Sequence, residues 1–292
     1  MTKITVVGSF AVGLTIRTGT MPVFGETIRG SDFNFGPGGK GSNQAVGTAR
    51  LGAKSSLITC LGRDHLAAVA DDLYKTEGVD GTGIRLTEDK ATGAGVIVLN
   101  GAGENFIILD MGANDLMDAA FVDDQQERIA NSDIIMTVLE IPVEAASRAM
   151  ELGKRSGART ILNPAPATAL PDSLFEHVDY LTPNETELRI LMDLPPDDPT
   201  PTRELARRLR DRGVGTVVVT MGPGGALVLT DEIEAMVRTP RVDVVDTTGA
   251  GDAFNSGLAV ALGEGRDLLD AVRFATCCGA PACTPLGVIP SL

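Results

Sequence analysis

The chain has 292 residues, of which 43% are hydrophobic and 22% are charged, a composition typical of a globular protein and not of a disordered one. Its 25 basic and 39 acidic residues give a formal net charge of −14. That balance argues against a nucleic-acid partner, because phosphate backbones are bound by clustered lysines and arginines. No apolar run reaches the roughly 18 residues of a membrane helix, and the first residues form a strand-like pattern that lacks the apolar segment of a signal peptide. We therefore expect a cytoplasmic protein with no membrane partner.

Short apolar strands alternate with helices along most of the chain. The predicted strands are residues 3–9, 55–61, 133–139, 159–163, 179–182 and 216–221. The predicted helices are residues 41–51, 64–77, 143–156, 185–192 and 202–212, and Asp64 is a suitable N-cap for the second of them. This alternation predicts an α/β fold with a mainly parallel sheet and helices on both faces.

Two segments interrupt the alternation. Residues 14–35 contain strand-like pieces and turns, and residues 92–111 predict a hairpin around Asn100-Gly101-Ala102-Gly103. We expect them to form a small antiparallel sheet that projects as a lid; the alternative is that they are edge strands of the main sheet. The predicted core is then residues 1–13, 36–91 and 112–292, and the predicted lid is residues 14–35 and 92–111.

The first segment with chemical potential is Gly36-Pro37-Gly38-Gly39-Lys40-Gly41-Ser42-Asn43-Gln44-Ala45, which leads into a helix. Its glycines let the backbone approach a ligand closely and leave N–H groups unhindered. A helix start of this kind favours an anionic or hydroxyl-rich ligand. Taken alone, the segment is equally well explained as a glycine turn before a helix.

Two common nucleotide motifs do not account for this segment. Gly36, Gly38 and Gly41 match the dinucleotide pattern G-x-G-x-x-G, but residues 55–61 carry no acidic side chain to hold a ribose. A Walker A loop is also excluded, because Lys40 is followed by Gly41 and not by serine or threonine.

The second segment is residues 246–257, Asp-Thr-Thr-Gly-Ala-Gly-Asp-Ala-Phe-Asn-Ser-Gly. It predicts a strand that ends near Val245, a turn of small residues, and a helix over residues 253–262. Consecutive amides from Gly249 to Gly251 would form an anion hole for a phosphoryl group in transfer. Asp252 beside them could take the proton from an attacking hydroxyl. The alternative is that Asp252 merely caps the helix.

Together, these two segments resemble the two signature regions of the ribokinase (pfkB-type) family of carbohydrate kinases. Residues 163–167, 182–187 and 220–225 also resemble ribokinase segments in order and spacing, so the resemblance covers nearly the whole chain. It implies a ribokinase-like three-layer fold. It further implies an ATP-dependent kinase that phosphorylates a primary hydroxyl of a small sugar.

The resemblance also implies roles for individual residues. Asp252 is the general base, and the amides of Gly249, Ala250 and Gly251 hold the γ-phosphate. The residues implied for the sugar are Gly39, Lys40, Asn43 and Glu140, besides Asp252. Those implied for ATP are Asn184, Thr220, Gly222, Gly225, Gly251 and Thr276. Two alternatives stay open, because Lys40 could be a solvated surface lysine and Glu187 an ordinary acidic residue in the first turn of a helix.

Metal ions are implied in the same way. Glu187 would act on Mg2+ through water, and family members often bind a monovalent cation, usually K+. The positions that match the cation site are Asp246, Thr248, Ala282, Pro285, Gly287 and Ser291. Oxygen ligands of this kind suit a hard cation.

Two features depart from the family pattern. Ribokinases carry an asparagine and an aspartate after the first strand to hold the sugar's secondary hydroxyls, and Ala11 and Gly13 stand there instead. We therefore doubt ribose itself and expect a sugar or polyol derivative that is bulkier or less hydroxylated at that edge. The family usually adds a final helix after the position of Ser291, whereas this sequence stops at Leu292, so we expect a less enclosed cation site and adenine pocket.

Two other functions fit parts of the sequence. The apolar residues Phe10, Ala11 and Val12 could accommodate a base, which would make the protein a nucleoside kinase of the same superfamily. A non-catalytic sugar-binding regulator is the other alternative, although an intact Gly249–Asp252 turn argues against it. An apolar face on the lid sheet would favour a homodimer through that sheet.

Overall fold

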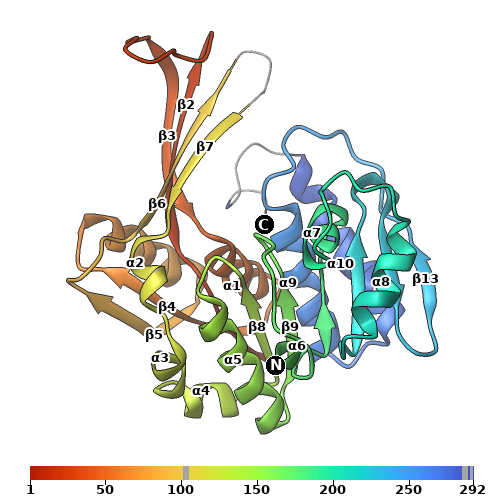
Figure 1. The fold of residues 1–292 in the computed structure, drawn as a ribbon. Helices are drawn as coiled ribbons and strands as arrows, with labels where there is room; N and C mark the ends of the chain where they lie inside the picture. The colour runs from red at the N-terminus through yellow and green to blue at the C-terminus, as the bar shows by residue number, and fades with distance from the viewer. Residues whose placement is uncertain (101–104, 285–288, 290–291) are drawn as a thin grey trace.

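The computed structural model describes residues 1–100, 105–284, 289 and 292, and its main element is a nine-stranded sheet (Figure 1). In spatial order its strands are β13 (Glu234–Val237), β12 (Ala226–Leu229), β11 (Thr216–Thr220), β10 (Tyr180–Leu181), β9 (Arg159–Asn163), β8 (Ile134–Val138), β1 (Lys3–Val7), β4 (Lys54–Gly62) and β5 (Asp80–Thr87). All pairs from β5 to β11 are parallel, and β12 and β13 add an antiparallel edge.

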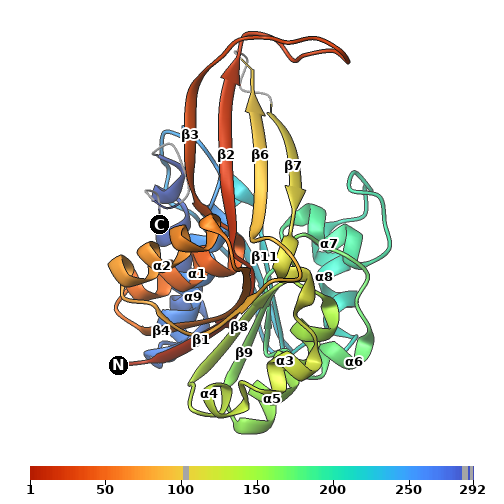
Figure 2. The same cartoon turned by 90° about the vertical axis from the view of Figure 1, so that its left-hand side faces the viewer.

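Helices cover both faces of this sheet (Figure 2). One face carries α1 (Lys40–Arg50), α2 (His65–Glu77), α9 (Ala250–Gly263) and α10 (Leu268–Gly279), which share one hydrophobic core. The other carries α3 (Ala119–Asp123), α4 (Gln126–Ala130), α5 (Val143–Ser156), α6 (Asp172–Phe175), α7 (Glu185–Leu191) and α8 (Thr202–Arg210), which share a second core. Short 3-10 turns span Gly112–Leu116, Gly222–Gly224 and Pro281–Cys283. The predicted three-layer α/β fold is confirmed.

Local signals set several helix ends. The Asp64 carboxylate accepts hydrogen bonds from the Leu66 and Ala67 amides at 2.9 and 3.1 Å, which confirms the predicted N-cap of α2. Helices α2 and α5 both end at glycines with positive φ, Gly78 at 70° and Gly157 at 84°. In the part of the chain that the structure describes, no helix is long and apolar enough to cross a membrane.

A separate four-stranded sheet projects from the core (Figures 1 and 2). Its order is β3 (Gly30–Gly38), β2 (Ala11–Thr18), β6 (Gly93–Leu99) and β7 (Asn105–Asp110), so the hairpin predicted over residues 92–111 is confirmed, and its residues 101–104 lie outside the described part of the chain. The sheet reaches to Ala11 and Gly38, within the ranges expected for the core.

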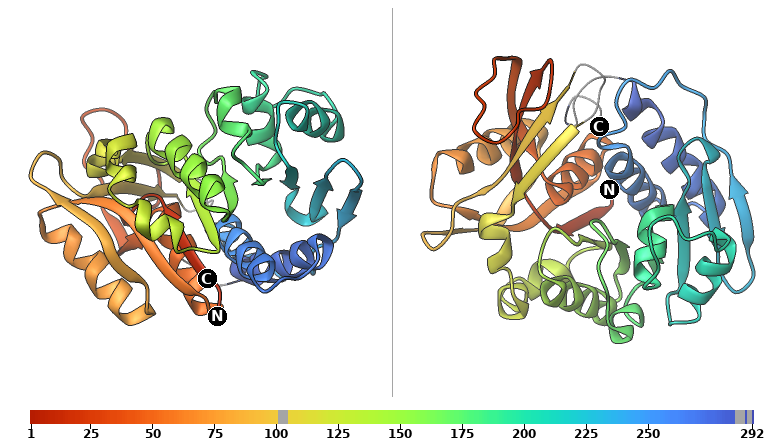
Figure 3. Two further views of the ribbon diagram at one scale, coloured as in Figure 1. Left: turned by 90° about the horizontal axis from the view of Figure 1, so that it is seen from below. Right: turned by 45° about the horizontal axis from the view of Figure 1, so that its top comes forward.

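The prediction that this small sheet is entirely antiparallel was wrong, because its two hairpins join through the parallel pair β2–β6. The physical reason is the direction of the chain. Strands β2 and β6 follow β1 and β5, which are parallel strands of the core sheet, so both leave the core from the same edge and in the same direction. The right-hand view of Figure 3 shows this sheet over the N-terminal elements, with the C-terminal elements in blue beside it.

The strand predicted to end near Val245 is absent, and residues 238–248 form a loop. Val244 and Val245 favour a strand by their β-propensity, but the sheet ends at the edge strand β13 and offers them no partner strand. They are accordingly 59% and 63% exposed. Instead, the amides of Val245 and Asp246 donate to the Cys283 carbonyl at 2.8 and 3.1 Å. This loop connects the sheet to α9.

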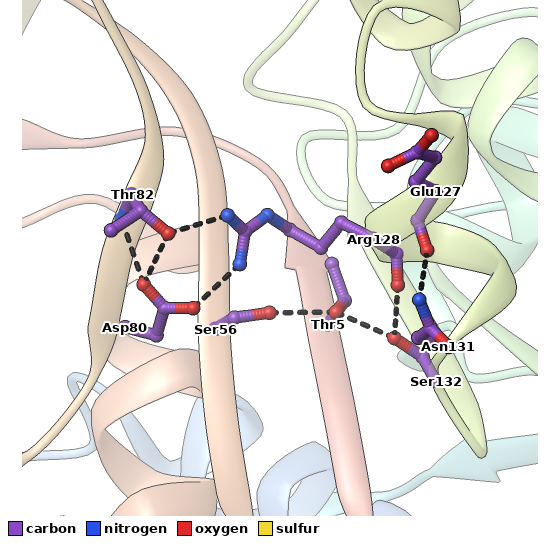
Figure 4. A network of polar contacts seen from close by, with 8 residues as sticks. All are labelled: Thr5, Ser56, Asp80, Thr82, Glu127, Arg128, Asn131 and Ser132. Carbon is purple, nitrogen blue, oxygen red and sulfur yellow. Dashed lines mark hydrogen bonds and ion pairs between the residues drawn. The ribbon is translucent and has the colours of Figure 1, made fainter.

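A polar network closes the amino-terminal edge of the parallel strands (Figure 4). Arg128 of α4 donates to the Asp80 carboxylate at 2.6 Å and to the Thr82 hydroxyl at 2.5 Å. Beside it, the Thr5 hydroxyl bonds to those of Ser56 and Ser132 at 2.6 and 2.7 Å. Because these groups bind one another across four elements, they serve to hold β1, β4, β5 and α4 together at the edge opposite the predicted site.

Candidate active site

Glu140, Asn184 and Thr220, three of the predicted site residues, lie at the carboxyl ends of the parallel strands, the edge at which open α/β sheets bind ligands. The strand order reverses at β1, because the chain continues from β1 to β4 and β5 on one side and resumes at β8 on the other side. Strand β1 therefore marks the switch point of the sheet. The residues that follow or end the strands here are Ser9 after β1, Glu140 after β8, Asn163 on β9, Asn184 after β10 and Thr220 on β11.

Glycines bring the first loop against the end of β1. Gly39 has φ of 88°, and a Cβ atom on it would lie 2.8 Å from the Ala11 amide nitrogen. A Cβ atom on Gly41 would lie 2.4 Å from the Ser9 amide nitrogen. Only glycine permits both approaches, and they place the start of α1, with Lys40 and Asn43, at the switch point.

Helix α1 crosses α9 closely at Gly47. A Cβ atom there would lie 2.4 Å from the Ser256 hydroxyl oxygen. That hydroxyl bonds to the backbone carbonyls of Gln44 at 3.1 Å and Asp252 at 2.8 Å. The crossing therefore brings one turn of α1 against the first turn of α9.

Asp252 is the buried acid at this crossing, with only 5% of its surface exposed. Its Oδ2 accepts from Asn43 Nδ2 at 2.8 Å and its Oδ1 accepts from Gln44 Nε2 at 3.0 Å. Burial raises the pKa of Asp252, and the Lys40 charge together with these two hydrogen bonds opposes that rise. Gly249 is the N-cap of α9 and the helix has no side-chain cap. The alternative that Asp252 merely caps the helix is therefore excluded.

Lys40 lies among carboxylates. Burial lowers its pKa, but the negative charges of Asp252, Glu140 and Glu187 more than compensate and leave the pKa of Lys40 raised. Glu140 accepts hydrogen bonds from the Ser9 hydroxyl at 2.6 Å and from the Lys40 amide at 2.7 Å. Lys40 is thus a partly buried, protonated cation, and the alternative of a solvated surface lysine does not describe it.

The start of α9 has the features of an anion site. Gly249 is left-handed with φ of 85°. The Ala250 amide already donates to the Thr247 carbonyl at 3.2 Å, so it would have to leave this acceptor to bind a phosphate. Gly251 and Asp252 occupy the first turn, where amides lack intrahelical acceptors. A Cβ atom on Gly251 would meet no atom within 4 Å, so the approach to these amides is open. An anion placed here would also interact favourably with the helix dipole.

The segments expected to contact ATP lie side by side. Asn184 and Glu187 form a capping box at the start of α7, each side chain bonding the other's amide at 2.8 Å, and Asn184 pairs with Thr220 in an isolated bridge. Glu187 therefore has the structural role proposed as its alternative, although burial also raises the pKa of this carboxyl. Gly222 and Gly225 have positive φ of 50° and 93° in the adjacent turn.

The remaining predicted residues lie nearer the C-terminus. Thr276 is 5% exposed on α10, and its hydroxyl donates to the Arg273 carbonyl at 2.8 Å. In the loop before α9, Asp246 Oδ1 accepts from the Thr248 amide at 2.9 Å and from its hydroxyl at 2.6 Å. Ala282 is buried beside Cys283, to which this loop is bonded. Pro285, Gly287 and Ser291 lie outside the described residues.

Four polar residues of the site were not predicted as site residues. Ser9 binds Glu140, Gln44 binds Asp252 and Asn163, and Asn255 binds the Gly251 carbonyl. All except Ser9 belong to the motif segments quoted above, so the signal was present in the sequence. What was lacking was the information that Gln44 donates to the Asp252 carboxylate and that Asn163 and Asn255 belong to the same hydrogen-bonded network.

The comparisons with known proteins agree with this geometry. The model of the pfkB family carbohydrate kinases matches residues 1–292. A ribokinase of Haemophilus influenzae is 35% identical over 289 residues, 99% of this chain and 94% of that protein. A deoxyribokinase of Salmonella typhimurium is 38% identical over 252 residues, 86% and 82% of the two chains. The chain belongs to the pfkB family of carbohydrate kinases.

A solved structure extends the similarity to three dimensions. The Arabidopsis thaliana ribokinase complexed with ribose and ATP superimposes with a TM-score of 0.93 at 31% identity and covers 100% of this chain and 96% of that one. This pfkB protein is accordingly an ATP-dependent sugar kinase, which excludes the non-catalytic regulator.

The substrate edge of this kinase is smaller than the sequence suggested. Phe10 and Val12 are both fully buried in the core, and Phe10 packs edge-on against Tyr74 with ring centroids 6.1 Å apart. Of the three residues of the proposed apolar edge for a nucleoside base, Ala11 alone retains some exposure, at 8%.

Replacing Gly47 by alanine should separate α1 from α9. Alanine in mid-helix ordinarily stabilises by about 1 kcal/mol relative to glycine. The contact with Ser256 should reverse this sign and destabilise by about 1–3 kcal/mol. Denaturant titration measures the free energy of unfolding and steady-state kinetics measures kcat, and we expect both to fall. Gly19→Ala, where a Cβ atom meets no neighbour within 4 Å, is the control. Parent-like stability and kcat in Gly47→Ala would contradict the need for this close crossing.

Proposed function

We propose that this kinase transfers the γ-phosphate of ATP to a primary hydroxyl of a small sugar, with Asp252 as the general base. The observation that carries the proposal is the position of the Asp252 carboxylate, which is buried, hydrogen-bonded to Asn43 of the first glycine segment, and seated in the first turn of α9. One side chain thus joins the segment assigned to the sugar with the helix start assigned to the phosphate.

In the proposed reaction, Asp252 takes the hydroxyl proton as the oxygen attacks the γ-phosphorus in line. The amides of Gly249, Ala250 and Gly251 stabilise the transferring phosphoryl group, and the Lys40 ammonium adds positive charge nearby. Gly39, Lys40, Asn43 and Glu140 would hold the sugar. Asn184, Thr220, Gly222, Gly225, Gly251 and Thr276 would hold ATP.

Oxygen donors among the described residues support the two expected metal ions. In the described part of the chain no three acidic, histidine or cysteine side chains gather to hold a metal, so Mg2+ would be carried by the ATP phosphates and reach Glu187 through water. Burial raises the pKa of the Glu187 carboxyl, and a nearby Mg2+ would stabilise its ionised form. For K+, Asp246, Thr248 and Ala282 offer oxygen ligands beside the start of α9, and Pro285, Gly287 and Ser291 would complete the set.

The small sheet would act as a lid. We assign to it residues 14–35 and 92–111, and to the core residues 1–13, 36–91 and 112–292. Strand β3 runs directly into the sugar segment, and β2 begins beside it, since Ala11 pairs with Gly38. Closure over the sugar would exclude water and limit wasteful ATP hydrolysis. We also propose a cytoplasmic location, which the use of ATP supports.

The acceptor is proposed to be a sugar other than ribose. The relatives include ribokinases and a deoxyribokinase, which supports a small sugar. However, Ala11 and Gly13 offer no polar side chain where ribokinases have asparagine and aspartate. Leaving two secondary hydroxyls unpaired would cost of order 1–3 kcal/mol each. An acceptor that is bulkier or less hydroxylated at this edge avoids that cost.

Removal of the base should abolish turnover. We expect Asp252→Asn to lower kcat by about 100- to 10,000-fold, the usual contribution of a general base, with little change in the ATP dissociation constant. Parent kcat should also fall as the pH decreases through a pKa above the 3.8 of an ordinary aspartate, because the base must be ionised and burial raises its pKa. Steady-state kinetics measures kcat and its pH dependence, and calorimetry measures the ATP dissociation constant. A near-normal rate in Asp252→Asn would refute the assignment.

A panel of pentoses, deoxypentoses, hexoses, polyols and nucleosides, each with Mg-ATP, should identify the acceptor by ADP release. We expect ribose not to be the best substrate. The variant Ala11→Asn/Gly13→Asp should then raise kcat/KM for ribose by roughly tenfold or more. Gly13 has room for this change, since the nearest atom to a Cβ would be Ile97 Cδ1 at 3.7 Å. Ribose as the preferred substrate of the parent would overturn the proposal, and a preference for nucleosides would favour the nucleoside kinase.

A homodimer through the lid is supported by an apolar row across its four strands. Phe35, Leu14, Val96 and Ile108 are successive cross-strand partners, so they share one face. Three of them are exposed, Phe35 at 43%, Val96 at 44% and Ile108 at 59%. The row is continuous and uncharged, which suits a second copy of the same row.

Light scattering should therefore give twice the mass of one chain, and Ile108→Lys should give a monomer. Leu109→Lys is a matched control because Leu109 is 55% exposed but, by strand alternation, lies on the opposite face. A monomeric parent protein, or equal dissociation by both variants, would contradict a dimer built on this face.

A further inference from the structure

A chain of buried hydrogen bonds leads away from Asp252. Gln44 Nε2, besides donating to Asp252, donates to Asn163 Oδ1 at 3.1 Å. Asn163 Nδ2 in turn donates to the Thr182 carbonyl at 3.1 Å. Gln44 and Thr182 are 0% and 1% exposed, so neither can contact a ligand directly.

The direction of these bonds is set by a backbone group. The Thr182 carbonyl can only accept, so the Asn163 amide must turn its NH2 group toward it and its oxygen toward Gln44. Gln44 then faces two acceptors, Asn163 Oδ1 and Asp252 Oδ1, and must present its own NH2 group to both. The main chain after β10 thereby determines that Gln44 is a donor to Asp252.

A second branch returns to the glycine turn. The Thr182 hydroxyl donates to Asn255 Oδ1 at 2.6 Å, and Asn255 Nδ2 donates to the Gly251 carbonyl at 2.8 Å. Asn255 is 1% exposed. The network therefore connects Asp252, the turn assigned to the phosphate, and residue 182, which lies two positions before the nucleotide residue Asn184.

We propose that Gln44 is a positioning residue that holds the Asp252 carboxylate ionised and oriented toward the reacting hydroxyl. Its hydrogen bonds through Asn163 to the Thr182 carbonyl connect this position to the nucleotide segment. This inference rests on the proposed role of Asp252 as base. Asn43 also donates to the carboxylate, but it lies in the sugar site and would be engaged by substrate. Gln44 is the donor that remains to Asp252 throughout the reaction.

The surroundings make this donor important. The charged groups that face Asp252 are Lys40 of α1, Glu140 after β8 and Glu187 of α7. Two of the three are acidic, and burial also disfavours the ionised carboxylate. Meanwhile the Gln44 Oε1 atom is buried and has no hydrogen-bond partner among the described residues. The unpaired oxygen lowers the contribution of Gln44 to the stability of the fold. Its NH2 group, in contrast, makes two hydrogen bonds, one of them to the Asp252 carboxylate.

The test replaces Gln44 by methionine, which keeps the length and removes the donor. We expect kcat to fall by roughly tenfold or more while KM for ATP and for sugar changes by less than about threefold, because the residue touches neither substrate. The acidic limb of the kcat profile should move up by about one pH unit, since a lost hydrogen bond to the carboxylate raises its pKa.

Thr48→Val is the matched control. Thr48 lies one turn further along α1, is 0% exposed, and bonds to Ser55 at 2.9 Å without contact to Asp252. This variant should lose a similar amount of stability in thermal unfolding and leave the acidic limb unchanged. An equal shift of the limb in both variants, or no shift in Gln44→Met, would overturn the proposal.

Asn163→Ala tests the network from its other end. It should shift the limb in the same direction by less, and Gln44→Met/Asn163→Ala should resemble Gln44→Met alone, because Asn163 acts through Gln44. Should Gln44→Met not fold, the Asn163→Ala profile decides, and an unchanged limb there refutes the inference. Asp252→Asn, measured in parallel, separates the two proposals: an active Asp252→Asn enzyme defeats the base assignment, whereas an inactive one with a parent-like Gln44→Met enzyme defeats only the role of Gln44.

Discussion

The close crossing of α1 over α9 is the constraint on which the site depends. Gly47 lets the Ser256 hydroxyl reach the backbone of both helices. This contact places the first turn of α9 beside the side-chain amides of Asn43 and Gln44. Without it the Asp252 carboxylate would be a buried charge lacking donors, which a protein interior does not tolerate. The same helix contact therefore serves both the packing of the core and the surroundings of the proposed base.

Electrostatics explains how a protein with a net charge of −14 can accommodate the phosphates of ATP. The positive potential is local. At the proposed phosphate site it would come from the first-turn amides of α9, left open beside Gly251, and from the Lys40 ammonium, which three carboxylates keep protonated. The same carboxylates would repel a phosphate if Lys40 were neutral, so the raised pKa of Lys40 is consistent with a site that binds anions next to acids.

The lid follows from the order of the core strands. Because β1 and β5 are parallel, the chain leaves both at the carboxyl edge, and β2 and β6 rise together above the site. Their hairpin partners then lie on the outside of the small sheet. An apolar row results on one face, so the position of the proposed lid and the surface proposed for a second chain both originate in the parallel core.

Local sequence patterns determined the alternation of strands and helices, the Asp64 cap of α2, the hairpin over residues 92–111 and the glycine turns, because each depends on neighbours within a few residues. The motif segments in the sequence also predicted the similarity to the pfkB family. The tertiary structure alone decided three things: that β2 and β6 pair in parallel, that Val244 and Val245 form no strand, and that Gln44 donates to Asp252. Each depends on residues far apart in the chain, since a strand needs a partner and the direction of the Gln44 amide is imposed by a carbonyl at residue 182.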